Sequence, residues 1–225
     1  MVTGSPETKV QVLNTDAKDR HLLLMVSQGE GSGRNRFSDK MVNKFLCGHD
    51  ERDWFVATAA SNVTTVAGAK ESLKPVEVVQ KQVGIKGKKR NKRHNPVFKR
   101  QGEWFFVPAP DLILGKHDII RKSEPISRSG RGGGKPHVCE ELVRYGGRTV
   151  WSKRNSGAEP ISDGAYKRLT LEGRIGYTAR SLNPTAYVRG RITHPDHATI
   201  KLTGWHKVMQ NNERSVSGMA FDFID

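Results

Sequence analysis

The stretch AYVRGRITHPDHATIKLTGWHKVM, residues 186–209, holds two segments rich in β-branched and aromatic side chains. Such residues are typical of β-strands. The tetrapeptide 195–198 between the segments contains proline and aspartate, which favour tight turns. The stretch therefore predicts an antiparallel hairpin, and other short apolar runs in the chain predict further strands.

The other predicted strands are 21–26 (HLLLMV), 53–60 (DWFVATAA), 76–83 (VEVVQKQV), 102–108 (GEWFFVP), two within 137–152 around a Gly146-Gly147 turn, and 219–224 (MAFDFI). Segment 41–47 fits either a strand or a helix. One helix is expected at 64–75, with Thr64 or Thr65 as its N-cap and Pro75 as its end. A second is expected at 162–173, between Ser162 and Gly173.

These elements predict an α+β fold, mainly antiparallel sheet with two or three short helices and long basic loops. Residues 1–20 are polar and are expected to form a flexible N-terminal arm. Residues 21–225 are expected to form a single domain, with basic loops at 84–101 and 121–136.

Charge is the strongest compositional signal. Lysine and arginine total 38 against 23 aspartate and glutamate, a formal net charge of +15. An excess of this size indicates an anionic partner. Only two cysteines occur, and the first residues lack the basic and apolar regions of a signal peptide. We therefore expect a cytoplasmic protein without a membrane partner.

Two basic segments are candidates for nucleic-acid binding, because clustered cations displace counterions from phosphates. With two arginines of the predicted hairpin, the candidate residues are Lys86, Lys88, Lys89, Arg90, Lys92, Arg93, Lys99, Arg100, Arg128, Arg131, Lys135, Arg189 and Arg191. RNA is favoured over DNA, because the sequence holds no helix-turn-helix, zinc finger or basic zipper. The glycine-rich segment lacks the spacing of a Walker A loop, so nucleotide hydrolysis has no support.

Histidines supply the candidate catalytic set, which is His137, His194, His197 and His206. Imidazoles near neutral pKa act as acid and base in the cleavage of RNA phosphodiesters. Alternatively, a divalent metal for hydrolysis would be held by His137, Glu141, His194, Asp196 and His197. The third interpretation is structural: His194 and His197 belong to a turn, and the other two hydrogen-bond at the edge of the core. No cofactor is expected, except a divalent metal under the nuclease alternative.

Three strings, RQGEWFFVP (100–108), GKPHVCEELVR (134–144) and RGRITHPDHATIKLTGWHKV (189–208), resemble segments of a set of uncharacterised bacterial proteins. The resemblance extends roughly from residue 45 onward. It implies no activity, cofactor or site residue.

The sequence thus predicts a basic nucleic-acid-binding protein, acting on RNA as a subunit or accessory of a ribonucleoprotein complex. Other protein subunits of that complex are further expected partners. The alternative is a metal-independent or metal-dependent ribonuclease that uses the histidines. A third hypothesis is an assembly protein whose charge serves an acidic protein partner.

Overall fold

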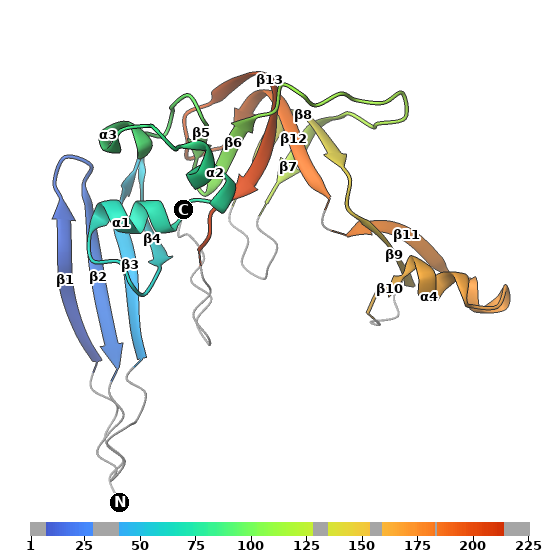
Figure 1. The fold of residues 1–225 in the computed structure, drawn as a ribbon, viewed down its shortest axis with the longest axis horizontal. Helices are drawn as coiled ribbons and strands as arrows, with labels where there is room; N and C mark the ends of the chain where they lie inside the picture. Colours follow the sequence, from blue (N-terminus) through green and yellow to red (C-terminus); the bar gives the residue numbers. More distant parts are fainter. Residues whose placement is uncertain (1–7, 29–40, 128–134, 154–158, 183, 214–225) are drawn as a thin grey trace, which may run out of the picture.

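The computed structural model describes residues 8–28, 41–127, 135–153, 159–182 and 184–213. The described chain is mainly antiparallel sheet, arranged as three separate sheets with short helices packed around them (Figure 1). Among the described residues, no helix is both long and apolar enough to cross a membrane.

The first sheet contains four strands in chain order: β1 (Thr8–Asp16), β2 (His21–Gln28), β3 (Met41–Asp50) and β4 (Asp53–Ala59). Helix α1 (Val66–Ser72) packs against it (Figure 1). Leu23, Leu46 and Ala57 are buried beneath Val66 and Ala69 of the helix. This face is the first hydrophobic core.

The second sheet has six strands in the order β5-β6-β13-β12-β8-β7. Its strands are β5 (Lys99–Gln101), β6 (Trp104–Pro108), β7 (Arg121–Ile126), β8 (His137–Tyr145), β12 (Thr185–Thr193) and β13 (Ile200–Gln210). Phe106, Leu142 and Ile192 lie in the main core of this sheet. A smaller cluster joins Phe98 and Phe105 to Val78 of helix α2 (Val76–Lys81), which precedes helix α3 (Gly87–Arg90).

The third sheet, β10 (Ile161–Ser162), β9 (Arg148–Lys153) and β11 (Tyr177–Leu182), extends away from the six-stranded sheet (Figure 1). Helix α4 (Asp163–Lys167) and the 3-10 turn η1 (Glu172–Arg174) accompany it. Trp151 stacks on Tyr166, with ring centroids 3.6 Å apart. The Trp151 indole also donates to Asp163 at 3.0 Å, so the aromatic pair ties α4 to this small sheet.

Several predictions from the sequence are confirmed. The hairpin is formed by β12 and β13, in which Tyr187 pairs with Lys207 and Ile192 with Ile200. Segments 21–26, 53–60 and 102–108 lie in or overlap strands β2, β4 and β6, and 41–47 is a strand. Thr65 and Ser162 cap their helices, each side-chain oxygen accepting a hydrogen bond from the backbone N–H three residues later.

Other predictions are wrong. Segment 76–83 begins with helix α2, because Val78 and Gln82, four residues apart, are its buried positions, which is a helical period. The predicted flexible arm at 1–20 is wrong for residues 8–16, which form strand β1. The backbone of β2 pairs with them along their length. The predicted basic loops contain helix α3 and strands β5 and β7.

The strands on either side of Gly146-Gly147 do not pair with each other. β8 pairs with β7 and β12, whereas β9 pairs with β10 and β11. The two glycines have φ angles of 71° and 91°, in the left-handed region that favours glycine, and they redirect the chain from one sheet to the next. The predicted strand 219–224 lies outside the described residues.

Candidate functional site

The basic segment between α2 and β6 divides into two chemically distinct groups. Its arginines are half-buried and lie in ion pairs: Arg90 bonds to Glu71 at 3.2 Å, and Arg100 lies 3.5 Å from Asp50. Arg93 pairs with both Asp50 and Glu51. Burial, with the neighbouring Arg100 charge, lowers the pKa of Arg93 to about 10, which leaves it charged at neutral pH. The positive charge of these arginines is therefore compensated inside the protein.

Lys74 anchors the end of helix α3. Its buried ammonium group donates three hydrogen bonds, to Glu71 at 2.8 Å, to Gln82 at 2.8 Å and to the Arg90 carbonyl at 2.9 Å. All three donors of the ammonium are thereby satisfied. Gln82, fully buried, donates to the same carbonyl at 2.8 Å. Helix α3 is therefore held against α1 and α2 by a charged and hydrogen-bonded network.

Burial opposes the ionised form of Glu71, but hydrogen bonds from Lys74 and Arg90 outweigh it and hold the pKa of Glu71 below its usual value. Burial also lowers the pKa of Lys74, with the Glu71 bond acting in the opposite direction. The pair is most stable with both groups ionised, because each charge offsets the desolvation of the other.

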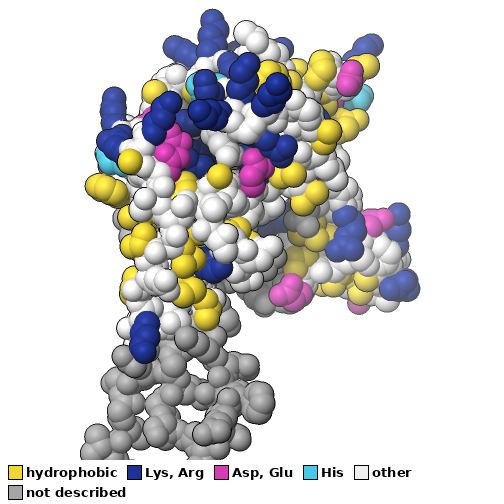
Figure 2. Space-filling model, turned by 60° about the vertical axis from the view of Figure 1, so that its left-hand side comes forward, with side chains coloured by type: hydrophobic (Ala, Val, Ile, Leu, Met, Phe, Trp, Pro, Cys, Tyr) yellow, Lys and Arg dark blue, Asp and Glu magenta, His cyan; other side chains and the backbone are white. Residues whose placement is uncertain are grey.

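The lysines of the segment form the second group. We call Lys86, Lys88, Lys89 and Lys92 the lysine platform. All four are exposed, and no carboxylate among the described residues lies within ion-pair distance of them. Figure 2 shows Lys and Arg side chains gathered over the end of the molecule that carries α3. The platform is thus a cluster of uncompensated positive charge on a fixed support.

The other predicted binding residues are less available. Lys135 pairs with Asp196 at 2.8 Å, and Arg191 with Glu140 at 3.3 Å. Lys99 donates to the Lys201 carbonyl. Arg189 forms an ion pair with Glu141, and its guanidinium carbon lies 4.7 Å from the centroid of the Trp205 ring. Arg128 and Arg131 lie outside the described residues.

Three of the four candidate histidines meet in one place. His137 begins β8, and His194 and His197 follow β12. Strand register explains the meeting: Val138 pairs with Thr193, so the residues next to them, His137 and His194, become neighbours. The ring centroid of His194 lies 4.3 Å from that of His137 and 4.6 Å from that of His197. The centroids of His137 and His197 are 5.5 Å apart. His206 is not part of this group.

The histidine cluster, defined as His137, His194 and His197, is buried, with side chains 1%, 6% and 7% exposed. Burial, followed by the two neighbouring imidazoles, lowers the pKa of His137 to about 3. The three rings therefore have little access to a large substrate, which an acid or base in RNA cleavage would have to touch.

His206 lies elsewhere on β13. One of its ring nitrogens is 3.0 Å from the Gly204 carbonyl. Burial lowers the pKa of His206, while that carbonyl opposes the shift. Of the carboxylates considered as metal ligands, Glu141 pairs with Arg189 and is not part of the group, whereas Asp196 pairs with Lys135 and lies 4.0 Å from His194 Nδ1.

Hydrogen bonds fix one imidazole of the cluster. The Asp196 N–H donates to His194 Nδ1 at 3.1 Å, so Nδ1 carries a lone pair. The proton is then on Nε2, which donates to the Lys135 carbonyl at 2.9 Å. Glu51 Oε2 lies 3.7 Å from His197 Nδ1 and accepts the Ala198 N–H at 2.6 Å. The Asp50–Glu51 turn therefore contacts both the basic segment and the histidine cluster.

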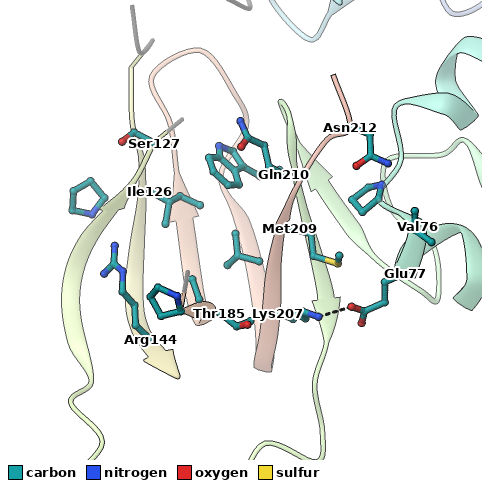
Figure 3. A pocket seen from close by; sticks show the side chains of 16 residues that line it. Val76, Glu77, Ile126, Ser127, Arg144, Thr185, Lys207, Met209, Gln210 and Asn212 are labelled. Carbon is teal, nitrogen blue, oxygen red and sulfur yellow. Dashed lines mark hydrogen bonds and ion pairs between the residues drawn. The ribbon is translucent and has the colours of Figure 1, made fainter. Parts of the chain in front are cut away.

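A separate pocket of about 670 Å³ lies between α2 and the six-stranded sheet (Figure 3). Its cations are paired, Lys207 with Glu77 and Arg144 with Glu124. The remaining lining groups include apolar side chains such as Ile126 and neutral amides. It therefore offers no uncompensated charge to an ionic ligand.

Sequence reasoning missed the residues that organise these sites: Asp50, Glu51, Glu71, Lys74 and Gln82. Glu51 is 42 residues from Arg93, and Glu71 is 19 residues from Arg90. Lys74 is nearer to its partners Glu71 and Gln82, but nothing in the local sequence shows that its ammonium group is buried between them. Gly102 was missed as well: its φ of 55° lies in the left-handed region that favours glycine, and it forms the turn between β5 and β6.

No protein-family model, curated protein or solved structure matches the chain. The similarity of the three strings to bacterial proteins stays a prediction.

Proposed function

We propose that the chain binds nucleic acid, with RNA as the preferred partner, through the lysine platform. The observation that carries this proposal is the division of charge in the basic segment. Its arginines are neutralised by Glu71, Asp50 and Glu51, whereas the platform lysines are exposed and have no carboxylate partner among the residues that the structure describes. Uncompensated, clustered cations bind phosphates by releasing condensed counterions.

The buried network beneath α3 supports the same proposal. Holding like charges close together is unfavourable unless a partner neutralises them. Here Lys74 and Gln82 fix the Arg90 carbonyl, which keeps the platform together in the free protein. A pre-organised site loses less conformational entropy on binding than a flexible one does.

The preference for RNA or single strands rests on the shape of the fold. The longest helix among the described residues, α1, has 7 residues. At about 1.5 Å per residue such a helix spans only about 10 Å, too short to follow a major groove while also packing on the sheet. Phosphate contacts from a compact cluster suit a single strand or an irregular RNA surface. A role as subunit or accessory of a ribonucleoprotein complex follows as the finer proposal.

The histidine cluster adds no cleavage step to this function. Its rings are buried, and the fourth candidate, His206, lies apart from them. We therefore place the chain in the binding class.

Purification from the host at low salt tests the partner class. We expect a high 260/280 nm absorbance ratio that falls after RNase and high salt. Material removed by DNase alone would contradict the preference for RNA. A preparation free of nucleic acid that retains an acidic protein would favour the assembly hypothesis. As a control for folding, the circular dichroism spectrum should not change after nuclease treatment.

A further inference from the structure

The spacing of the three buried imidazoles matches the geometry of a shared metal ion. With metal–nitrogen bonds of about 2.1 Å, each ring centroid lies about 3.2 Å from the metal, so centroids sit about 4.5 Å apart at octahedral angles and about 5.2 Å at tetrahedral ones. The measured separations are 4.3, 4.6 and 5.5 Å. Because each centroid lies 4.3 to 5.5 Å from the other two, the centroids form a triangle and not a line, and the ring planes are tilted by 24° to 29° from one another.

The ligand atoms themselves lie near one another. One nitrogen of each ring lies within 4.8 Å of the others. His137 Nε2 is fully buried and has no hydrogen-bond partner among the described residues. A buried, unpartnered imidazole nitrogen is costly, and a bound ion is one way to satisfy it.

His194 already has the outer contact that metal-binding histidines usually have. Its Nε2–H donates to the Lys135 carbonyl, which fixes the tautomer with a lone pair on Nδ1. That lone pair now accepts the Asp196 N–H at 3.1 Å, a hydrogen bond that an ion would replace. Glu51 Oε2 lies 3.7 Å from His197 Nδ1. In metal sites a carboxylate often contacts the imidazole nitrogen that does not bind the metal and so orients the ring.

Gly102 leaves the space that an ion would need. A Cβ atom at this position would lie 3.1 Å from His197 Nε2 and 3.5 Å from His137 Nε2. Both nitrogens therefore face the same side of the β5–β6 turn, and a methyl group there would fill the region between them.

We propose that His137, His194 and His197 bind one divalent transition-metal ion of the zinc class, beside the backbone of Gly102. Imidazole nitrogens suit zinc, cobalt, nickel and copper, whereas magnesium and calcium require oxygen ligands. The ion joins the start of β8 to the β12–β13 turn, beside the β5–β6 turn, and so fastens one end of the six-stranded sheet.

The full-length protein, stripped with a chelator, is equilibrated with Zn²⁺ and passed through a desalting column. Elemental analysis should find about one zinc per chain, and excess Mg²⁺ or Ca²⁺ should not displace it. With Co²⁺ as the probe, visible absorption bands of nitrogen-bound cobalt should appear and saturate at the same ratio. Zinc should also raise the unfolding temperature of the wild-type protein, and the chelator should reverse the rise.

Two pairs of variants locate the site. His194→Ala should lose the metal, whereas His206→Ala, which removes another buried histidine outside the cluster, should keep it. Gly102→Ala should also lose it. Its control is Gly204→Ala, which carries the same left-handed backbone strain (φ 79° against 55°) but would meet nothing within 4 Å.

The proposal is overturned if the wild-type chain retains no zinc and shows no cobalt bands. It is equally overturned if all four variants retain metal as the wild type does, since the binding would then belong to surface histidines such as His94 and His117. If one variant does not fold, the other pair of variants still locates the site. RNA binding measured with chelator present tests the lysine platform separately, so the two proposals fail independently.

Discussion

Replacing all four lysines of the platform by alanine should weaken RNA binding and flatten its dependence on salt. The substitution removes exposed side chains that have no ion-pair partner in the described part of the chain, so the fold should lose little stability. The matched control replaces four other exposed cations, Lys116, Arg148, Arg168 and Arg180. Each variant lowers the formal net charge by four, from +15 to +11, so a difference between them reports position and not total charge.

The expected magnitude follows from the number of contacts. Each phosphate contact on a single strand contributes about 0.7 to the slope of log K against log salt, so four contacts contribute about 2.8. If the contacts add nothing at about 1 M salt, the platform variant should bind roughly 600-fold more weakly at about 0.1 M. That loss corresponds to about 3.8 kcal/mol of binding free energy.

Fluorescence anisotropy with a labelled uridine-rich RNA, titrated at several salt concentrations, measures both quantities. The control variant should keep a slope close to that of the wild type. A platform variant whose slope is unchanged, or a control variant that loses as much affinity, would refute the assignment of phosphate contacts to α3.

Three further predictions concern stability, measured by denaturant unfolding. Gly48→Ala should lower the free energy of unfolding by about 2 to 3 kcal/mol, because the added methyl carbon would lie 2.1 Å from the His21 ring. Gly87→Ala, whose methyl carbon would meet nothing within 4 Å, should change it by less than about 1 kcal/mol. Equal losses in the two variants would contradict this explanation. Lys74→Met should lose about 2 to 3 kcal/mol, because it removes a buried ammonium group that donates to Glu71, to the buried Gln82 side chain and to the Arg90 carbonyl. Lys81→Met, at an exposed ion pair, should change stability by less than about 1 kcal/mol, and a similar loss in both would count against the network. Because burial lowers the pKa of His21 to about 4 from an ordinary 6.5, the unfolded chain binds more protons between these values, so stability should fall as pH drops through this window. His21→Phe should flatten that fall, and an unchanged slope would show that other groups cause it.

Elements with strong local signals could be predicted from the sequence. The β12–β13 hairpin has two apolar strands next to a turn, and its pairing needs no distant partner. The N-caps Thr65 and Ser162 are equally local, because each oxygen satisfies a backbone N–H three residues away.

The failures have non-local causes. Segment 76–83 alternates like a strand, but Val78 and Gln82 find their buried partners only on a helix, beside the β6 core and Lys74. Strand β1 is polar, and its pairing with β2 is what makes it a strand. The glycine pair at 146–147 fits a hairpin locally, yet the sheets that receive β8 and β9 are built by residues 121–126 and 161–182.

The candidate sites follow the same rule. The basic segment was visible in the sequence, but the distinction between its arginines and lysines depends on Glu71, Asp50 and Glu51. His137 is 57 residues from His194 in sequence, and only the register between β8 and β12 brings them together. Charge composition alone therefore identified the basic segment. Only the tertiary structure shows which of its cations are free of internal ion pairs among the described residues.

Glu51 connects the two sites. Its backbone has a φ of 54°, a left-handed conformation that costs a non-glycine residue about 1 to 2 kcal/mol. Three contacts offset that cost: the ion pair with Arg93, the hydrogen bond from Ala198 and the approach to His197. The turn that fixes the arginines behind the lysine platform is thus the same turn that lies behind the histidine cluster. A metal ion bound by the histidines would hold His197 and Ala198 in place against Glu51, and through Glu51 would steady the arginine that lies next to the platform.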